Sequence, residues 1–290
     1  MGTDLLSILP AMVVFIGLQF ALHELARRFV VSATVLFVLM LSSIPFWNAN
    51  LDGWFRWAKS ISVLVPTVLL FVARIAHRRP HPKLDVFEGK WLMWVAYAVL
   101  MLNIAEATIK DVTLGNYWNS IVGVIVAATI PIKPRDWYIE RDSKFNDFLF
   151  SLPTLWCVLY TTWNICFVYG ERTEFTAHVF SILMVPLAYS VIMKRPDLWY
   201  SARVTTLASS LFFRSAYDVV TPYMDTSSWA NAKVTQTFGL INLALAFAYL
   251  GYLGYRKKNS KTQVTDEPSQ DEAQPTPLPH SESGVHSKVG

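Results

Sequence analysis

Ionisable side chains inside long apolar segments are the residues of this chain most able to do chemistry. Two carboxyls stand out, Glu106 and Asp218, because the segments around them, 91–108 and 204–221, consist mostly of apolar and small residues. A carboxyl within lipid loses its hydration, which favours its protonated form, and a protonated carboxyl can donate a proton to an alkene or an epoxide. We therefore expect Glu106 to act as a general acid and Asp218 as a second catalytic carboxyl.

A second group of side chains has the spacing of a binding surface. Tyr160, Asn164, Phe167 and Glu171 follow the i, i+4, i+7, i+11 pattern of one helical face. Such a stripe combines aromatic surface with a few hydrogen-bonding groups, as small-molecule sites do. Together with polar residues of other apolar segments, it gives the predicted substrate-binding set: Asn103, Tyr160, Asn164, Phe167, Glu171, His178, Arg214 and Asn242.

The same residues also have structural interpretations. Glu106 precedes Lys110 by four residues, the favoured order for an ion pair along a helix, and Arg214 and Asp218 have the same separation. Such pairs would stabilise the helices without any catalytic role. The other polar candidates could hydrogen-bond between helices or lie near an interface without chemistry, namely Asn164, Asn242 and His178.

The segments that carry these residues are typical of membrane-spanning helices. The 290 residues are 53% hydrophobic and only 16% charged, whereas a globular domain carries roughly 25% charge, so the composition excludes a soluble enzyme. Because backbone polar groups must be paired in lipid, each apolar run of about 17 to 25 residues predicts a spanning helix. The expected fold class is all-α, a polytopic transmembrane bundle of about nine helices: 5–22, 30–46, 60–75, 91–108, 117–132, 148–168, 176–193, 204–221 and 234–255.

The distribution of Lys and Arg predicts how this bundle is oriented. Alternate connections hold 18 of these basic residues, Arg203 among them, and the other connections hold five. Since basic residues favour the cytosolic side, an odd number of helices places the N-terminus outside or in the lumen and the C-terminus in the cytosol. Most of the polar candidates then fall in the non-cytosolic halves of their helices, which predicts a water-accessible cavity that opens on that side.

The predicted domain organisation is one bundle, 1–256, followed by a disordered cytosolic tail, 257–290, whose polar composition cannot bury enough apolar surface to fold. The net charge of +4 is assigned to cytosolic loops that face anionic lipid. The expected partners are therefore the lipid bilayer and a hydrophobic small-molecule substrate, and no nucleic acid. No glycine-rich phosphate loop and no metal-type spacing occurs, so no metal and no cofactor are expected, and Cys157 and Cys166 are expected to be small core residues.

Several short motifs resemble an uncharacterised family of multi-spanning, mostly bacterial membrane proteins. The resemblance covers nearly the whole membrane part and implies no activity. Its motifs are WFRWAK at 54–59, NIAEATIKD at 103–111, YTTWNICFVY at 160–169, the early His178, and LWYSARVTTLAS at 198–209.

A more remote resemblance is to the seven-helix membrane terpene cyclases of fungal meroterpenoid and indole-diterpene pathways. It rests on NIAE at 103–106, PRDW at 134–137 and WYSAR at 199–203, and it implies that Glu106 is the catalytic acid. The chain departs from that family in three ways. The spacing from Asn to Glu is one residue shorter, Asn242 stands where the cyclases carry an aspartate, and two extra N-terminal helices are present.

The leading hypothesis is a membrane-embedded enzyme that acts on a hydrophobic, isoprenoid substrate by acid-initiated cyclisation or isomerisation, a terpene-cyclase-like lyase or isomerase. Aromatic side chains would shield and stabilise the carbocation. One alternative is a transporter or sensor that binds a small polar or cationic solute through Glu106, Asn164, Glu171 and Asp218. A further alternative is a structural membrane protein whose buried polar groups only determine packing.

Overall fold

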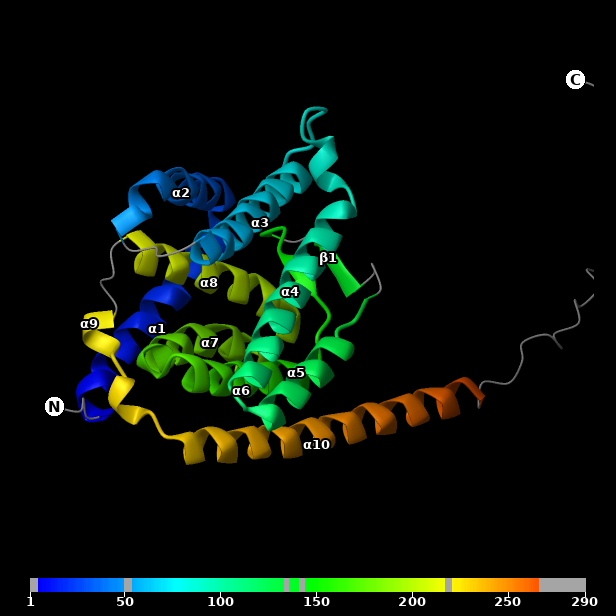
Figure 1. Cartoon of the computed structure of the whole chain (residues 1–290). Coiled ribbons are helices and arrows are strands. Elements are labelled where there is room, and N and C mark those ends of the chain that lie inside the picture. The colour runs from blue at the N-terminus through cyan, green and yellow to red at the C-terminus, as the bar shows by residue number, and fades with distance from the viewer. Residues whose placement is uncertain (1–4, 50–53, 133–135, 141–143, 217–220, 266–290) are drawn as a thin grey trace, which may run out of the picture. The chain divides into compact units, whose positions relative to one another are not determined.

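The computed structural model describes residues 5–49, 54–132, 136–140, 144–216 and 221–265, and these residues are almost entirely helical (Figure 1). Two short antiparallel strands, β1 (Trp137–Ile139) and β2 (Phe148–Phe150), are the exception. The α-helices are α1 (Leu5–Arg28), α2 (Val30–Ser42), α3 (Trp54–Arg78), α4 (Trp91–Thr113), α5 (Tyr117–Ala128), α6 (Thr154–Glu171), α7 (Thr176–Val191), α8 (Trp199–Ala216), α9 (Thr221–Met224) and α10 (Ala232–Thr265).

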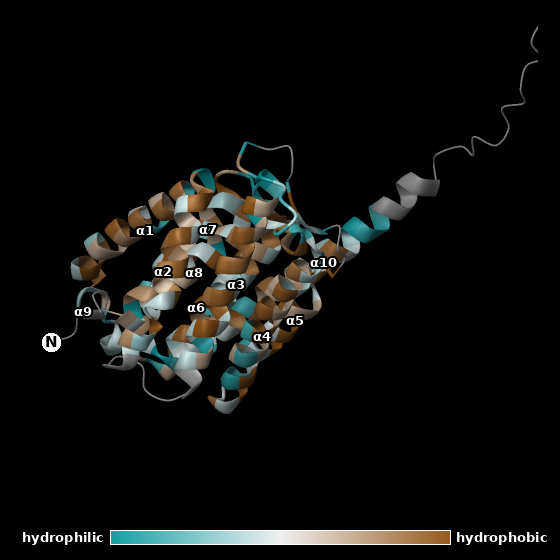
Figure 2. Cartoon of the chain, turned by 90° about the horizontal axis from the view of Figure 1, so that it is seen from above, coloured by the Kyte–Doolittle hydropathy of each residue, from teal (hydrophilic) through white to brown (hydrophobic). Residues whose placement is uncertain are grey.

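Five of these helices are long and apolar enough to cross a membrane by length and composition. They contain the segments Leu5–Arg28, Trp57–Arg78, Trp91–Thr113, Thr173–Val191 and Ala232–Asn259, while α2 and α5 are apolar but shorter. Large apolar side chains are exposed along these helices, including Leu18 of α1, which is 62% exposed, and Leu102 of α4, which is 68% exposed. Hydrophobic residues also dominate the middle of the helices in Figure 2, and hydrophilic residues gather toward helix ends and loops. Such a surface suits lipid better than water.

The expectation of an all-helical fold is confirmed, but some predicted boundaries are wrong. Residues 148–150 were assigned to a spanning helix, whereas they form β2, and α6 begins only at Thr154. Pro153 is the N-cap residue of this helix, where a missing N–H is harmless, so it lies before the helix and does not interrupt it. By contrast, Pro66 and Pro186 do lie inside α3 and α7.

The last helix extends further than predicted. α10 continues to Thr265, although the tail was expected to be disordered from residue 257 onward. The chain divides into two compact units, Met1–Tyr249 and Leu250–Gly290. The first unit contains α1 to α9 and the beginning of α10, and in the second the described residues continue α10.

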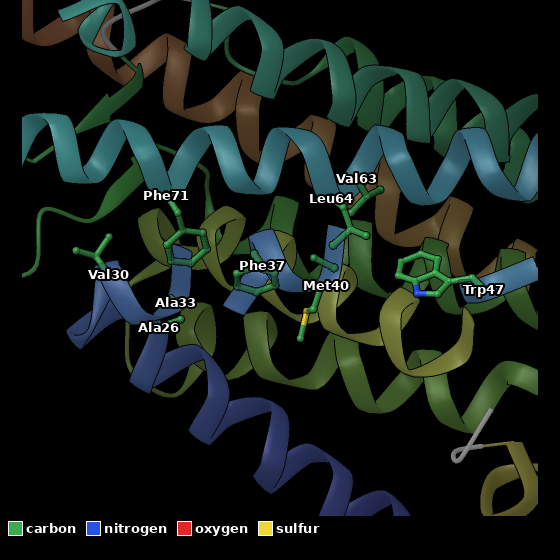
Figure 3. Close-up of a cluster of buried hydrophobic side chains, with 10 residues drawn as sticks. Ala26, Val30, Ala33, Phe37, Met40, Trp47, Val63, Leu64 and Phe71 are labelled. Carbon is green, nitrogen blue, oxygen red and sulfur yellow. The ribbon is translucent and has the colours of Figure 1, made fainter. Parts of the chain in front are cut away.

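The core between α2 and α3 shows how the helices hold together. Phe37 of α2 and Phe71 of α3 are buried and stack with ring centroids 5.2 Å apart. Leu64 and Trp47 extend the same cluster (Figure 3), to which Ala208 of α8 also belongs. Small residues at positions such as Ala208 let helices approach closely, which favours association in lipid through van der Waals packing.

A buried cluster of charges ties α1 and α3 to the loop that precedes β2. Asp147 accepts hydrogen bonds from Arg27 at 3.1 Å and 2.6 Å, and Arg74 lies 3.4 Å from the same carboxylate. Arg74 also donates to the backbone carbonyls of Ala26 and Arg27 at the C-terminal end of α1, where a cation complements the helix dipole. Glu24 pairs with Arg27 at 2.7 Å and accepts a hydrogen bond from Tyr189 of α7. One cluster therefore anchors three helices.

We predict that Asp147→Asn destabilises the protein by about 3 to 5 kcal/mol, because the substitution leaves the buried guanidinium group of Arg74 without its counter-ion and removes one of the two carboxylates that pair with Arg27. Asp197→Asn is the matched control, since it removes an exposed pair with Arg195 worth about 0 to 1 kcal/mol. Thermal melting or denaturant titration of both variants in detergent measures the difference in their free energies of unfolding. Equal stabilities would contradict a structural role for the cluster.

Candidate functional site

A cavity of about 300 Å³ lies among α3, α4, α6, α7 and α8. Its wall includes polar residues of four of these helices, with aromatic and aliphatic residues between them. Seven of the ten predicted site residues line it: Asn103, Glu106, Tyr160, Asn164, Phe167, Glu171 and Arg214. Residues that the sequence analysis did not select also contribute, notably Lys59, Arg172, Phe175, Arg203 and Ser210.

Glu106 forms an ion pair across two helices. Its carboxylate accepts a hydrogen bond from Lys59 of α3 at 2.8 Å, and both side chains are about one-third exposed. The expected partner was Lys110 on the same helix, so that prediction is wrong. The face of α4 that carries Glu106 packs toward α3, which brings Lys59 within reach although it lies 47 residues away in sequence.

The stripe on α6 contributes one wall, as its spacing predicted. Tyr160 is 2% exposed, stacks on Trp156 with centroids 5.4 Å apart, and meets Trp199 of α8 edge-on at 4.7 Å. Asn164, one turn further on, makes no side-chain hydrogen bond within the described part of the chain. Its amide is therefore available to a molecule in the cavity.

Arg203 is a basic lining residue that the sequence analysis assigned to a cytosolic connection. It lies inside α8 and is only 7% exposed. Its guanidinium lies over the ring of Tyr160 at 6.0 Å from the centroid, and its Nε and Nη1 atoms are buried without a hydrogen-bond partner among the described residues. The signal that could have found it is the i, i+4 spacing from Trp199, which places both side chains on one helical face.

Two guanidinium groups share one aromatic ring beside the cavity. Arg214 lies over Phe175 at 3.7 Å from the ring centroid, and Arg172 lies over the same ring at 4.5 Å. Arg172 also pairs with Glu174 at 2.8 Å. The face of an aromatic ring attracts cations, so Phe175 holds both side chains in place.

Three predicted site residues do not line the cavity in the described structure. His178 is 2% exposed and hydrogen-bonds the hydroxyl of Ser210, which does line it, so His178 lies directly behind the wall. Asn242 is fully buried elsewhere and donates to Asn119 at 3.0 Å. Asp218, the predicted second catalytic carboxyl, lies outside the described residues, and so does its expected pair with Arg214.

Asn242 belongs to a buried polar network centred on Asp111. Asn119 donates to this carboxylate at 2.7 Å and Asn116 donates to it at 3.0 Å. Asn119 in turn accepts from Asn242, and its amide lies 3.2 Å from the carbonyl oxygen of Trp163. The network therefore connects α4, α5, α6 and α10. Its hydrogen bonds join helices, which is the structural role considered for Asn242 as an alternative, although Oδ1 of Asn116 and Oδ1 of Asn242 are buried without a partner among the described residues.

The described residues contain no group of three or more His, Cys, Asp or Glu side chains that could hold a metal ion. Cys157 and Cys166 are free and buried, as expected for small core residues.

Four basic residues and two acidic residues line the cavity within the described ranges: Lys59, Arg172, Arg203, Arg214, Glu106 and Glu171. The lining is therefore more basic than acidic.

Comparison with protein-family models, with curated proteins and with solved structures finds no match to this chain.

We predict that Asn119→Leu lowers the free energy of unfolding by about 1 to 3 kcal/mol, because Asp111 and Asn242 each lose a buried hydrogen-bond partner. Asn103→Leu is the matched control, since the amide of Asn103 bonds only to Val99 of its own helix and faces the cavity. Thermal melting in detergent compares the two variants. A larger loss for Asn103→Leu than for Asn119→Leu would contradict this division between network and cavity.

Proposed function

We propose that the protein is a membrane-embedded enzyme that binds a hydrophobic, isoprenoid-type molecule in this cavity and cyclises or isomerises it by proton transfer at Glu106. The observation that supports the proposal is the placement of an ionisable carboxyl in a cavity whose wall combines aromatic and aliphatic side chains with polar and charged ones. Tyr160, Phe167 and Phe175 offer ring faces to a developing carbocation. A substrate of this kind dissolves in the bilayer, so it can reach a helical bundle without a soluble domain.

The ion pair with Lys59 sets a condition on the proton donor. Glu106 accepts a hydrogen bond from Lys59 at 2.8 Å, so the carboxyl must take up a proton before it can donate one. The ammonium of Lys59 supplies this proton: when an apolar substrate excludes water, proton transfer from Nζ to the carboxylate leaves a neutral amine and a neutral carboxyl, because desolvation disfavours charge. Glu106 then protonates the substrate, and after cyclisation or isomerisation a carboxylate removes a proton from the cation. Glu171 is the second carboxyl that lines the cavity and is a candidate for that final step.

The alternatives fit the cavity less well. Binding of a small polar solute would give no role to the ring faces of Tyr160, Phe167 and Phe175 in the cavity wall. A purely structural role does not require an open cavity with polar groups available to a ligand.

We predict that Glu106→Gln abolishes product formation, with a loss of about 10² to 10⁴ in rate, while the protein still accumulates in the membrane. Lys59→Met should also impair the reaction, because it removes the partner that controls the protonation of Glu106. Lys110→Met is the matched control and should be nearly silent. The measurement is untargeted profiling of hydrophobic metabolites in cells that express each variant at equal level. Wild-type profiles from Glu106→Gln would exclude the proton-transfer role.

We also propose nine membrane crossings, with the N-terminus outside or lumenal and the C-terminus cytosolic. The five long apolar helices would be joined by α2, α5, α6 and α8. At 1.5 Å per residue, the 13 residues of α2 cover only about 20 Å, so this helix would cross with its flanking turns or where the bilayer is thin.

The orientation predicts that a protease-sensitive tag at the C-terminus of the full chain is cleaved from the cytosolic side and that a tag at the N-terminus is protected. The reason is the excess of Lys and Arg in alternate connections. Selective permeabilisation of expressing cells measures both tags. Finding both ends on one side would mean an even number of crossings.

A further inference from the structure

Arg203 is a buried cation whose environment differs from those of Arg27 and Arg74, the other arginines that are buried among the described residues. Arg27 pairs with Glu24 and Asp147. Arg74 donates to the carbonyls of Asn146, Arg27 and Phe145 at 2.9 to 3.0 Å, and it also pairs with Asp147. Arg203 is 7% exposed, and its Nε and Nη1 have no acceptor within the described ranges of the chain. An unpaired buried charge is costly by several kcal/mol. This difference points to an acceptor that comes from outside the chain.

The position of Arg203 indicates the kind of molecule that would supply this acceptor. Arg203, Tyr160 and Asn103 line both the main cavity and a smaller pocket of about 30 Å³. The rest of that pocket is apolar, formed by Val63, Pro66, Leu70, Val99, Leu100, Val204 and Leu207, with the ring of Tyr200. A molecule held here would meet a guanidinium and hydrocarbon side by side, so it would be an amphiphile.

The charges around Arg203 favour an anion. Lys59 is compensated by Glu106, and Arg172 is compensated by Glu174. The planar guanidinium of an arginine matches carboxylate and phosphate groups, to which it can donate two parallel hydrogen bonds. The ring of Tyr160 lies beside the guanidinium of Arg203 and limits the orientations that this group can take.

We infer that Arg203 binds the anionic head, a carboxylate or a phosphate, of a small prenyl-type amphiphile. The inference rests on the proposed function and specifies its substrate class. A cavity of about 300 Å³ is at the small end of ligand sites, which span about 300 to 1,000 Å³. The ligand is therefore short, of the order of two isoprene units with a head group.

The test is binding to the purified full-length protein in nanodiscs, measured by calorimetry with four probes: geranyl monophosphate, geranic acid, geraniol and inorganic phosphate. One of the two anionic prenyl probes should bind at least about tenfold more tightly than neutral geraniol, because a hydrogen-bonded charge contributes about 1.5 to 3 kcal/mol and 1.4 kcal/mol is a factor of ten. This comparison uses only the wild-type chain.

Arg203→Gln should abolish the preference for the anionic probe while the melting temperature of the unliganded protein stays the same or rises, because the substitution removes an uncompensated buried charge. A residue with a purely structural role would instead lower that temperature. Arg195→Gln, at an exposed pair with Asp197, is the control and should leave all affinities unchanged.

The other outcomes separate this inference from the proposed function. Equal affinity for geraniol and both anionic prenyl probes would overturn the role of Arg203 and leave the proposed function standing. Binding of inorganic phosphate as tight as that of geranyl monophosphate, without binding of geraniol, would support the anion site and contradict a hydrophobic substrate. Absence of binding by all four probes would count against both.

Discussion

A charge inside an apolar helical bundle must meet a partner, and this constraint organises the structure. The charge of Arg74 has several partners, since four backbone carbonyls and one carboxylate surround its guanidinium. Around Asp111 two asparagine amides satisfy the carboxylate. Among the described residues, Nε and Nη1 of Arg203 have no hydrogen-bond partner. The exception lies at the cavity, where a bound molecule can take the place of a protein group.

The satisfied clusters hold the walls in position. The cluster at Asp147 connects α1, α3 and α7 through Arg27, Arg74 and Tyr189. On the other side, Tyr200 of α8 donates to the carbonyl of Ala96 in α4 at 2.9 Å. Because these contacts anchor the helices at several points, the polar side chains between them can face an open space without collapse of the bundle. A rigid scaffold around a small polar site is the usual arrangement for binding and catalysis.

Relations within one helix could be predicted from the sequence, because the period of 3.6 residues determines which side chains share a face. The stripe from Tyr160 to Glu171 and the pair of Asn103 and Glu106 do line one cavity. Partners between helices could not be predicted in the same way. Lys59 lies 47 residues from Glu106, and the choice between it and Lys110 depends on how α3 and α4 pack.

Arg203 shows a different limit of the sequence. The count of basic residues places Arg203 in a connection between helices, because it closely follows Lys194 and Arg195. In the structure, α8 begins at Trp199, so Arg203 lies within a helix of the bundle. The segment before α6 was misassigned for a related reason. Its apolar FLF sequence continues the hydrophobic run, yet Pro153 separates the two, and residues 148–150 pair with β1 instead. In both cases the local turn, and not hydrophobicity, decides where the helix starts.

We propose that the polar residues of α3, α4, α6 and α8 form a site for a small molecule. A cryo-electron microscopy map of the full-length protein, purified from native membranes into nanodiscs, would show whether such a molecule is bound. We expect non-protein density in the cavity, with an anionic end against Arg203 and an apolar end among the aliphatic side chains. A closed cavity, with the guanidinium of Arg203 hydrogen-bonded to a carboxylate or carbonyl of the chain itself, would contradict it.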